Sequence, residues 1–314
     1  YAKLRSQYCA TAQSCLRIVK FLWFRRHQWQ PAIWSIAKLM TKGADLTLIN
    51  GQFCEDVSVS NRGLAYGDGL FETILVRDFR PLWLDDHLAR LVSGAKQLNI
   101  PCDIAELKRD CARLLADFSK PVAALKIVIT RGASMRGYTP HAARSERIVS
   151  IAAYTQNRLF WDDGIAVAVC QTQLSSQPKL AGIKHLNRLE QVLAAEEIHR
   201  RGFHEGLMTE RGLVVEGSRS NLFVVVDGIL LTPSLSRCGV DGIMRQRVLK
   251  HANALGLETR IKELGVSVLC GAEEAFVCNS LFGIWPISKV ECAHMQIGPI
   301  SRLLQREFDT YFYL

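Results

Sequence analysis

The chain has 314 residues, 48% of them hydrophobic and 22% charged, so it can bury a large core and is expected to form two domains. Its formal charge of +9 is concentrated at the front, because eight of its 39 Lys and Arg residues lie within residues 1–42, which hold no Asp or Glu. The rest of the chain carries 31 basic against 30 acidic residues, and this balance gives no reason to expect a nucleic-acid partner.

Residues 1–42 are expected to form a basic N-terminal extension. The first 39 residues are acid-free and rich in aromatic residues, and Met40 stands just before the first expected strand. One interpretation is that Met40 is the natural start and that the earlier residues are not native. The others are a targeting peptide and an interfacial amphipathic helix around residues 16–24. No apolar run approaches the roughly 20 residues of a membrane span, so no membrane partner is expected for the body of the chain.

Residues 43–155 are expected to form a small α+β domain. Runs rich in apolar residues predict its strands, and apolar residues at helical spacing predict its helices, the second of which begins after Asp103 as N-cap. The polar segment 155–158 is the predicted linker to the next domain. The expected strands are 46–50, 70–76, 124–130 and 148–154, and the expected helices are 84–98 and 104–118.

Residues 156–314 are expected to form a larger second domain, which completes an α/β fold. Its first helix has apolar residues that recur at helical spacing, Leu186, Leu189, Val192 and Leu193, and it is expected to stop at Gly202. Turn pairs, Arg-Gly at 211–212 and Asp-Gly at 227–228, separate neighbouring strands. The expected strands are 164–171, 205–209, 213–216, 222–226, 229–232 and 275–279, and the expected helices are 186–201, 242–255 and 299–311.

Ten cysteines are scattered along the chain with no C-x-x-C pair and no Cys/His spacing typical of a metal site. We therefore expect no metal ligands and interpret the cysteines as reduced thiols. Several lie in apolar runs, as Cys278 does, where cysteine behaves as a small core residue. This usage favours a cytoplasmic enzyme over a disulfide-stapled secreted protein.

Two segments carry the residues with the clearest chemistry. Lys184 lies in GIKHLNRLEQ (182–191), and Glu216 follows 32 residues later in VEGSRSNLF (215–223). A lysine amine can condense with an aldehyde cofactor and can later move protons as base and acid. A carboxylate beside the nitrogen of a pyridine ring keeps that nitrogen protonated, so that the ring draws electrons. Out of context, each residue would be read as an ordinary solvated lysine or turn carboxylate.

These two segments resemble the lysine and glutamate motifs of the class IV aminotransferases, the fold type IV pyridoxal-phosphate enzymes. The resemblance covers roughly residues 47–314. It implies pyridoxal 5′-phosphate as the cofactor, bound between two domains, and a homodimer. It also implies that Lys184 is the catalytic residue attached to the cofactor, that Glu216 faces the pyridine nitrogen, and that Ser218 and Asn221 contact the cofactor.

The same resemblance assigns residues to the cofactor phosphate, which needs positive charge and backbone donors. HLARL (87–91) resembles the family's phosphate-arginine motif, although its arginine could otherwise be an exposed helical residue. In GVDGIMR (239–245) glycines precede a helix whose first amides are expected to face the phosphate, and relatives often have threonine where Met244 stands. The residues assigned to cofactor binding here are Arg90, the amides of Ile243 and Met244, Asn279 and Ser280.

Two further motifs concern the substrate. AYGDGLFET (65–73) resembles the family's early signature and places Phe71 beside the substrate, although its glycines also fit a simple tight turn, and Asp68 is not assigned as an acid. TRGASMRGY (130–138) ends in Arg-Gly-Tyr, as in a lyase subgroup whose loop reaches over the site to meet substrate carboxylates. Arg131, Arg136 and Tyr138 are the expected substrate-binding residues, since two arginines suit a dianion. A flexible basic loop is the alternative.

The lysine segment resembles this lyase subgroup in particular. That resemblance implies a carbon-oxygen lyase that converts 4-amino-4-deoxychorismate into 4-aminobenzoate and pyruvate in folate biosynthesis. A D-amino-acid or branched-chain amino-acid transaminase on the same fold is the main alternative, and a membrane-surface or nucleic-acid binder acting through residues 1–42 is a third. No Walker loop, nucleophile elbow, H-E-x-x-H motif or G-x-G-x-x-G motif follows a predicted strand, so kinases, hydrolases and Rossmann dehydrogenases lack support.

Overall fold

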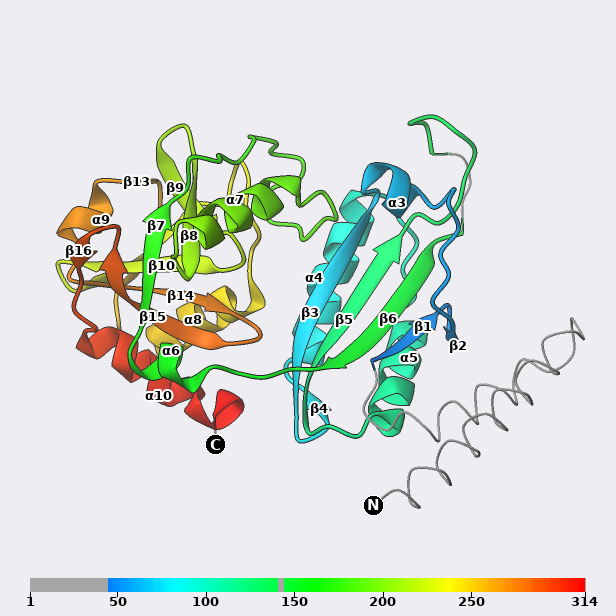
Figure 1. Cartoon of the computed structure of the whole chain (residues 1–314), viewed down its shortest axis with the longest axis horizontal. Coiled ribbons are helices and arrows are strands. Elements are labelled where there is room, and N and C mark those ends of the chain that lie inside the picture. The colour runs from blue at the N-terminus through cyan, green and yellow to red at the C-terminus, as the bar shows by residue number, and fades with distance from the viewer. Residues whose placement is uncertain (1–44, 141–143, 314) are drawn as a thin grey trace, which may run out of the picture. The chain divides into compact units, whose positions relative to one another are not determined.

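Two β-sheets organise the part of the chain that the computed structural model describes, residues 45–140 and 144–313 (Figure 1). The first sheet is built from residues before 155 and the second from residues after it. Residues 45–314 nevertheless form one compact unit, so the division into two domains stays a prediction. The interpretations of residues 1–42 lie outside the described residues.

The first sheet has six strands in the order β2-β1-β6-β5-β3-β4, and every neighbouring pair is antiparallel. Helices α4 and α5 cover one of its faces (Figure 1). Its elements are β1 (Leu46–Ile49), β2 (Gln52–Phe53), α3 (Arg62–Tyr66), β3 (Gly69–Arg77), β4 (Arg80–Pro81), α4 (Leu84–Gln97), α5 (Ile104–Asp117), β5 (Val122–Thr130) and β6 (Glu146–Ala153).

The pleat of this sheet explains its burial. In β5, Leu125 and Ile127 are fully buried while Lys126 between them is exposed, because successive side chains point to opposite faces. Helix α5 begins where expected, since the Asp103 carboxylate accepts hydrogen bonds from the amides of Ala105 and Glu106. The strands and helices predicted for this part of the chain are confirmed to within two residues.

The second sheet has ten strands in the order β12-β11-β10-β14-β15-β7-β8-β9-β13, with β16 paired to β15. Parallel pairs join β15 to β7, β7 to β8 and β11 to β12, and the other pairs are antiparallel. Its elements are α6 (Arg158–Asp162), β7 (Ile165–Val169), α7 (Leu189–Arg200), β8 (Glu205–Glu210), β9 (Leu213–Gly217), β10 (Asn221–Val226), β11 (Ile229–Pro233), α8 (Ile243–Ala254), β12 (Thr259–Lys262), β13 (Leu264–Gly265), α9 (Val268–Gly271), β14 (Glu274–Asn279), β15 (Gly283–Val290), β16 (Ala293–His294) and α10 (Pro299–Phe312).

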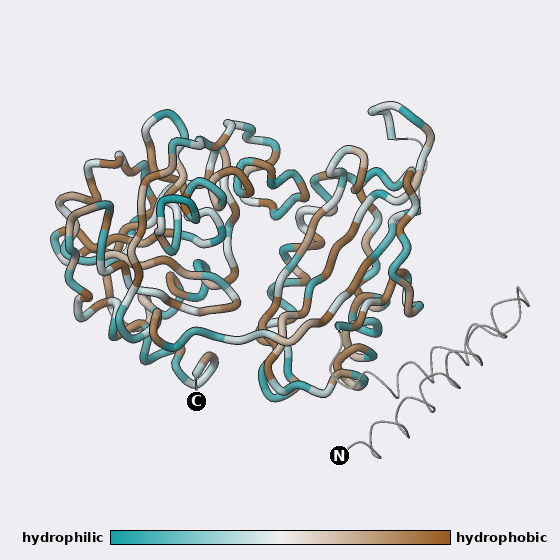
Figure 2. Tube along the Cα trace, viewed as in Figure 1, coloured by the Kyte–Doolittle hydropathy of each residue, from teal (hydrophilic) through white to brown (hydrophobic). Residues whose placement is uncertain are grey.

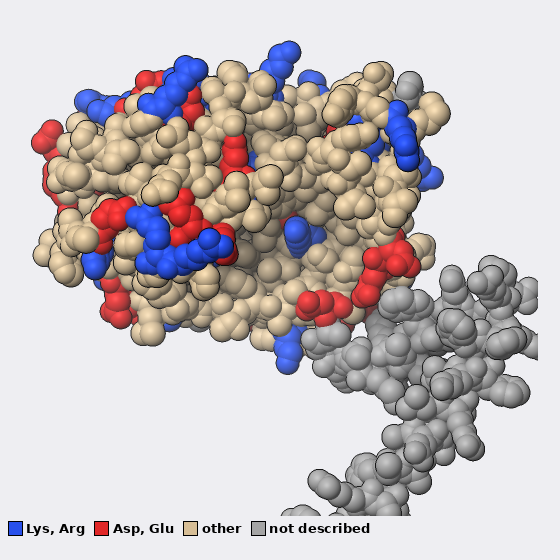
Figure 3. Space-filling view, turned by 45° about the horizontal axis from the view of Figure 1, so that its top comes forward, with Lys and Arg blue, Asp and Glu red and all other residues tan. Residues whose placement is uncertain are grey.

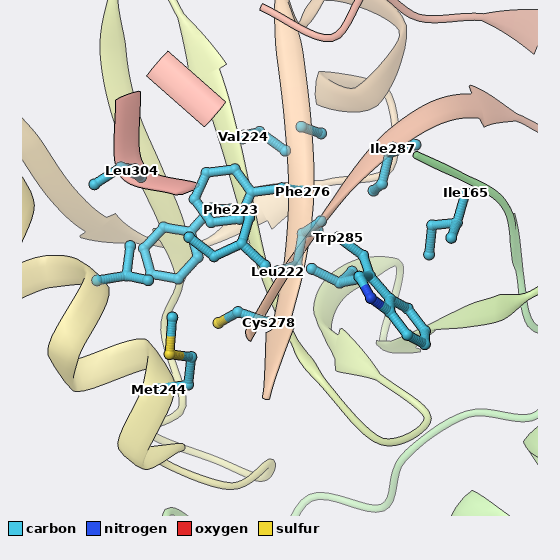
Figure 4. Packing of buried hydrophobic residues seen from close by; sticks show 14 of the residues in the cluster. Ile165, Leu222, Phe223, Val224, Met244, Phe276, Cys278, Trp285, Ile287 and Leu304 are labelled. Carbon is cyan, nitrogen blue, oxygen red and sulfur yellow. The ribbon is translucent and has the colours of Figure 1, made fainter. Parts of the chain in front are cut away.

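The core of this second part lies between the central strands and the helices α8 and α10. The rings of Phe223 and Phe276 stack with centroids 5.0 Å apart, and Met244 and Leu304 lie beside them (Figure 4). Hydrophobic residues follow the central strands of the sheet (Figure 2). A buried apolar core of this kind holds β10 and β14 in place, and both strands end at the cavity described below.

Strand β15 was not predicted, and its proline shows why. Pro286 has no backbone N–H and argues against a central strand, yet it pairs opposite Phe276 of β14. The pairing of β15 with β7 on its other side shifts register between Ile287 and Lys289. Burial of Ile284, Trp285 and Ile287 in the core therefore outweighs the local cost of the proline.

Two predictions for the start of the second part were wrong. Arg158 was placed in the linker but is the first residue of the short helix α6, whose N-cap is the Asn157 side chain. Helix α7 begins at Leu189 rather than at residue 186. Residues 184–186 are instead held in an extended segment by two backbone hydrogen bonds to β3.

The apolar residues that recur along α7 do not face the core. Leu189, Val192 and Leu193 are 71%, 59% and 54% exposed, whereas Ala194 and Ile198 are the buried residues of this helix. Exposed apolar side chains grouped on one helix face are typical of an interaction surface. We call these three side chains the α7 apolar face.

Basic and acidic side chains are interspersed on the face shown in Figure 3, with no broad region of one sign. Within residues 45–140 and 144–313, no helix combines the length and the apolar composition needed to cross a bilayer.

Candidate active site

Lys184 lies on the wall of a cavity of about 420 Å³. Its segment is extended and pairs with β3, because the amide of Phe71 donates to the Lys184 carbonyl at 3.0 Å and the amide of Leu186 donates to the Gly69 carbonyl at 3.0 Å. The Lys184 amine lies 4.4 Å from the centre of the Phe71 ring. The first sheet therefore determines where the lysine stands in the cavity.

The environment of Lys184 favours the neutral amine. Burial and the positive charge of Arg90 lower the pKa of Lys184 to about 8, and the carboxylates of Glu72 and Glu216 oppose this only in part. At mildly alkaline pH a large fraction of the amine is then unprotonated, as a nucleophile or general base requires.

Glu216 stands at the end of β9 on another wall of the same cavity and is 4% exposed. Its Oε2 atom accepts a hydrogen bond of 2.8 Å from the amide of Val240. Burial raises the pKa of Glu216, while the Val240 amide and the charges of Arg188 and Lys184 oppose the rise. The carboxylate is thus held in one position, close to cations, where it can meet a protonated ring nitrogen.

Arg90 is held by a buried carboxylate. Its Nε and Nη2 atoms donate to the two oxygens of Glu72 at 2.8 and 2.5 Å, and Nη1 donates to the Asp241 carbonyl at 2.8 Å. These bonds use three of the five N–H groups of a guanidinium, and the remaining two have no hydrogen-bond partner among the described residues, so they can meet a ligand in the cavity that Arg90 lines.

His87 completes this group, because its Nδ1 atom lies 2.6 Å from a Glu72 oxygen. Both side chains are fully buried. Burial lowers the pKa of His87, and although burial alone would raise the pKa of Glu72, the Arg90 charge and the hydrogen bonds of His87 and Arg90 lower it. A neutral His87 therefore donates from Nδ1 to a charged Glu72, and its Nε2 atom has no partner in the described chain.

An anion site lies at the start of α8. Ile243 and Met244 line the cavity, and Gly242, the N-cap, provides no side-chain hydrogen bond to the first amides. A Cβ atom at Gly242 would lie 2.0 Å from the Asn221 Oδ1 atom, so any side chain here would have to displace the Asn221 amide. Uncapped amides at a helix N-terminus attract an anion such as a phosphate.

The other residues assigned to the cofactor also reach the cavity. Asn221, Ser218, Asn279 and Ser280 all line it. Asn221 donates to the Val240 carbonyl at 2.8 Å, and Asn279 accepts from the amides of the turn that follows β14. The Ser218 hydroxyl donates to Glu205 at 2.5 Å, so toward a ligand this hydroxyl acts only as an acceptor. The contacts that these residues make with the cofactor stay predictions.

Only one of the four residues expected to bind substrate lines the cavity. Phe71 lines the cavity, but Arg131, Arg136 and Tyr138 do not. Arg131 is bound to Asp68 by two hydrogen bonds, whereas Tyr138 is 83% exposed. Their roles toward a substrate stay predictions.

Arg188 was not predicted, although it lies in the same segment as Lys184. It lines the cavity and donates to the carbonyls of His185 and Ile183 at 2.8 and 3.3 Å. Its charge opposes the rise of the Glu216 pKa and contributes to the fall of the Lys184 pKa. The motif GIKHLNRLEQ contained this residue, but only the fold shows that it enters the cavity.

The cavity fits a planar pyridine aldehyde that carries a phosphate. A weakly basic amine, a fixed buried carboxylate and an uncapped helix N-terminus with an adjacent arginine share its walls. These are the groups that pyridoxal 5′-phosphate needs for attachment, for its ring nitrogen and for its phosphate.

The lowered pKa of Lys184 predicts how Lys184→Met changes stability with no cofactor bound. A shift from 10.5 to about 8 opposes folding by about 3 kcal/mol while the lysine is protonated in both states. We expect the variant to raise Tm by roughly 5–10 °C at pH 7. Between pH 8 and 10.5 the unfolded wild-type chain binds more protons than the folded one, so wild type should gain stability as the pH rises. The Tm difference between Lys184→Met and wild type should therefore shrink. Thermal unfolding at several pH values measures this, with the exposed Lys179→Met as control. If Lys184→Met raised Tm by the same amount at pH 7 and at pH 10.5, the lowered pKa of Lys184 would be contradicted.

Comparison with known proteins agrees with this site. A family model described as amino-transferase class IV matches residues 69–290. An aminodeoxychorismate lyase of Vibrio harveyi is 33% identical over 269 residues, which cover 83% of this chain and 99% of that protein. A putative branched-chain-amino-acid aminotransferase of Methanocaldococcus jannaschii is 32% identical over 271 residues, which cover 83% of this chain and 94% of that protein.

Solved structures share the fold. The crystal structure of 4-amino-4-deoxychorismate lyase from Pseudomonas aeruginosa matches with a TM-score of 0.80 and 42% identity, covering 84% of this chain and 98% of that chain. The branched-chain amino acid aminotransferase of Escherichia coli matches with a TM-score of 0.79 and 26% identity, covering 86% and 95%. The predicted α/β fold of type IV and the predicted cofactor are confirmed, and the chain belongs to the class IV aminotransferase family, whose members depend on pyridoxal phosphate.

Proposed function

We propose that this enzyme is a 4-amino-4-deoxychorismate lyase, which forms 4-aminobenzoate and pyruvate in folate biosynthesis. The observation that carries the proposal is the higher identity to the lyase structure than to the aminotransferase structure at similar coverage. The lysine segment GIKHLNRLEQ, whose Lys184 and Arg188 both enter the cavity, supports the same choice. The free cysteines in the described chain agree with a cytoplasmic location.

The residues of the cavity have distinct roles in this reaction. The bound cofactor supplies an electron-withdrawing ring. Lys184 removes the proton from the carbon that bears the substrate amine and then donates a proton to the departing enolpyruvyl oxygen, for which a pKa of about 8 is well suited. Glu216 keeps the ring nitrogen protonated, and Arg90 with the first amides of α8 holds the phosphate.

A homodimer is part of the proposal. The α7 apolar face is exposed in a single chain, and Val192 belongs both to this face and to the cavity wall. Arg131, Arg136 and Tyr138 do not line the cavity of their own chain, so we place this loop over the cavity of the second copy. A dimer would cover the apolar face and complete the substrate side of the site together.

Glu72→Gln tests how the phosphate arginine is held. The change removes the negative charge and one of the two acceptors that fix Arg90, so we expect cofactor affinity to fall roughly 10–100-fold. Titration with pyridoxal 5′-phosphate, followed by the cofactor's absorbance, measures this. Glu258→Gln alters an exposed ion pair and serves as control. A variant with a lower Tm but unchanged cofactor affinity would show that Glu72 is only structural.

The product assay tests the reaction itself. With 4-amino-4-deoxychorismate and no keto acid, the holoenzyme should release pyruvate and 4-aminobenzoate in equal amounts, because elimination needs no amino acceptor. Lys184→Met should abolish both products, since the amine that moves both protons is lost. Rapid amino transfer from leucine or D-alanine to 2-oxoglutarate, without pyruvate from 4-amino-4-deoxychorismate, would establish the transaminase alternative instead.

The pair of changes Leu189→Glu and Leu193→Glu tests the dimer. Two charges on the α7 apolar face should convert a dimer into a monomer, because buried unpaired carboxylates are costly. Sedimentation velocity at micromolar concentration measures the assembly, with Ile261→Glu as a control at an exposed apolar residue on β12. A wild-type monomer, or a doubly changed protein that remains dimeric, would rule out this interface.

A further inference from the structure

Asp68 lies in the tight turn between α3 and β3 and is shared by two arginines. Its Oδ2 atom accepts from Arg62 Nε at 2.8 Å and from Arg131 Nε at 2.7 Å, and its Oδ1 atom accepts from Arg131 Nη2 at 3.1 Å. All three side chains are at most 14% exposed. One carboxylate therefore joins α3 to the start of the 131–138 loop through charge-assisted hydrogen bonds.

Arg62 extends this network to the far end of the loop. Its Nη1 atom donates to the Gly137 carbonyl and its Nη2 atom to the Tyr138 carbonyl, each at 2.8 Å. The Gly137 amide donates to the Tyr66 hydroxyl at 3.3 Å, and the rings of Tyr66 and Tyr138 lie 5.4 Å apart. The loop is thus attached to α3 at its end as well as at its start.

The two arginines of the loop differ sharply. Arg131 donates to the carbonyls of Asn99 and Leu98, each at 2.8 Å, in addition to Asp68, so four of its five N–H groups are used. Arg136 is exposed and makes no hydrogen bond or ion pair with the described residues. A guanidinium that binds a carboxylate bidentately needs a free edge, which Arg136 has and Arg131 lacks.

The charge of Asp68 persists at neutral pH. Burial alone would raise its pKa, but the hydrogen bonds and charges of Arg131 and Arg62 outweigh this effect and hold the pKa of Asp68 below its usual value. Because a lowered carboxyl pKa stabilises the folded network above that pKa, the ion pairs are complete throughout the neutral range.

We propose that Asp68 is a positioning residue that clamps the 131–138 loop through Arg62 and Arg131, and that Arg136 alone of the two loop arginines binds a substrate carboxylate. The assignment of a ligand to Arg136 rests on the proposed function, in which this loop meets a dicarboxylate. The clamp itself depends only on the contacts within the chain. Arg131 then holds the loop in place rather than binding substrate. It was expected to bind substrate only because of its position in the motif TRGASMRGY.

Chymotrypsin cleavage after Tyr138 in the full-length holoenzyme tests the clamp without any substrate. We expect Asp68→Asn to raise the cleavage rate at Tyr138 at least 10-fold, because neither arginine keeps its ionic partner, and Arg62→Lys to do the same by releasing both carbonyls. Arg136→Gln is the matched control within the loop and should leave the rate within 2-fold of wild type. Mass spectrometry identifies the cleaved bond. Unchanged cleavage in Arg62→Lys would overturn the clamp, even if Asp68→Asn does not fold.

Kinetics with 4-amino-4-deoxychorismate test the division between the arginines. Arg136→Gln should raise KM at least 10-fold with little change in kcat or in cleavage, whereas Arg131→Lys should raise KM and the cleavage rate together. If Arg131→Lys raises KM while the loop stays resistant to cleavage, Arg131 is a ligand and this part of the proposal is wrong. If wild type does not turn over this substrate, the proposed function fails, and the same comparison is made with 2-oxoglutarate as amino acceptor from leucine.

Discussion

The pairing of the Lys184 segment with β3 is the constraint on which the site depends. Two backbone hydrogen bonds, from the amides of Phe71 and Leu186, keep residues 184–186 extended and postpone the start of α7 to Leu189. A helix that began three residues earlier would not have the extended backbone with which His185 pairs opposite Leu70. The amine would then be carried away from the wall formed by Phe71. The same strand positions Glu72 on its opposite face, so one strand supports Lys184 on one side and Arg90 on the other.

The charges around the cavity alternate in sign, and each is adjusted by its neighbours. Arg90 and burial make Lys184 a weak base, while Lys184 and Arg188 help to keep Glu216 ionised against burial. Glu72 balances Arg90 without neutralising the helix N-terminus at Ile243. Interactions between charges are strong in a poorly solvated cavity, so the spacing of these groups decides their protonation. The arrangement places a weakly basic amine and uncapped helix amides on the walls of one cavity.

The residues proposed for the substrate are held differently from those proposed for the cofactor. The proposed cofactor residues stand on strands and on a helix start whose positions the core determines, whereas the 131–138 loop depends on a small polar network around Asp68. Val192 of the α7 apolar face also lines the cavity, where its side chain is exposed. All members of the family use the same cofactor, which a rigid set of strands and helices can bind. Their substrates differ, and a loop can change in sequence to bind a different substrate.

Much of this protein was predictable from its sequence. Periodicity and capping residues predicted most strands and helices, and the segments around Lys184 and Glu216 indicated the family and its cofactor through their resemblance to the family's motifs. Tertiary structure alone decided four features. These are the strand through Pro286, the start of α7 at Leu189, the α7 apolar face and the hydrogen bonding of Arg131 to Asp68. The physical reason is the same in each case. Partners distant in the chain, such as Phe276 for Pro286, Phe71 for Lys184 and Asp68 for Arg131, supply contacts whose free energy exceeds any local preference.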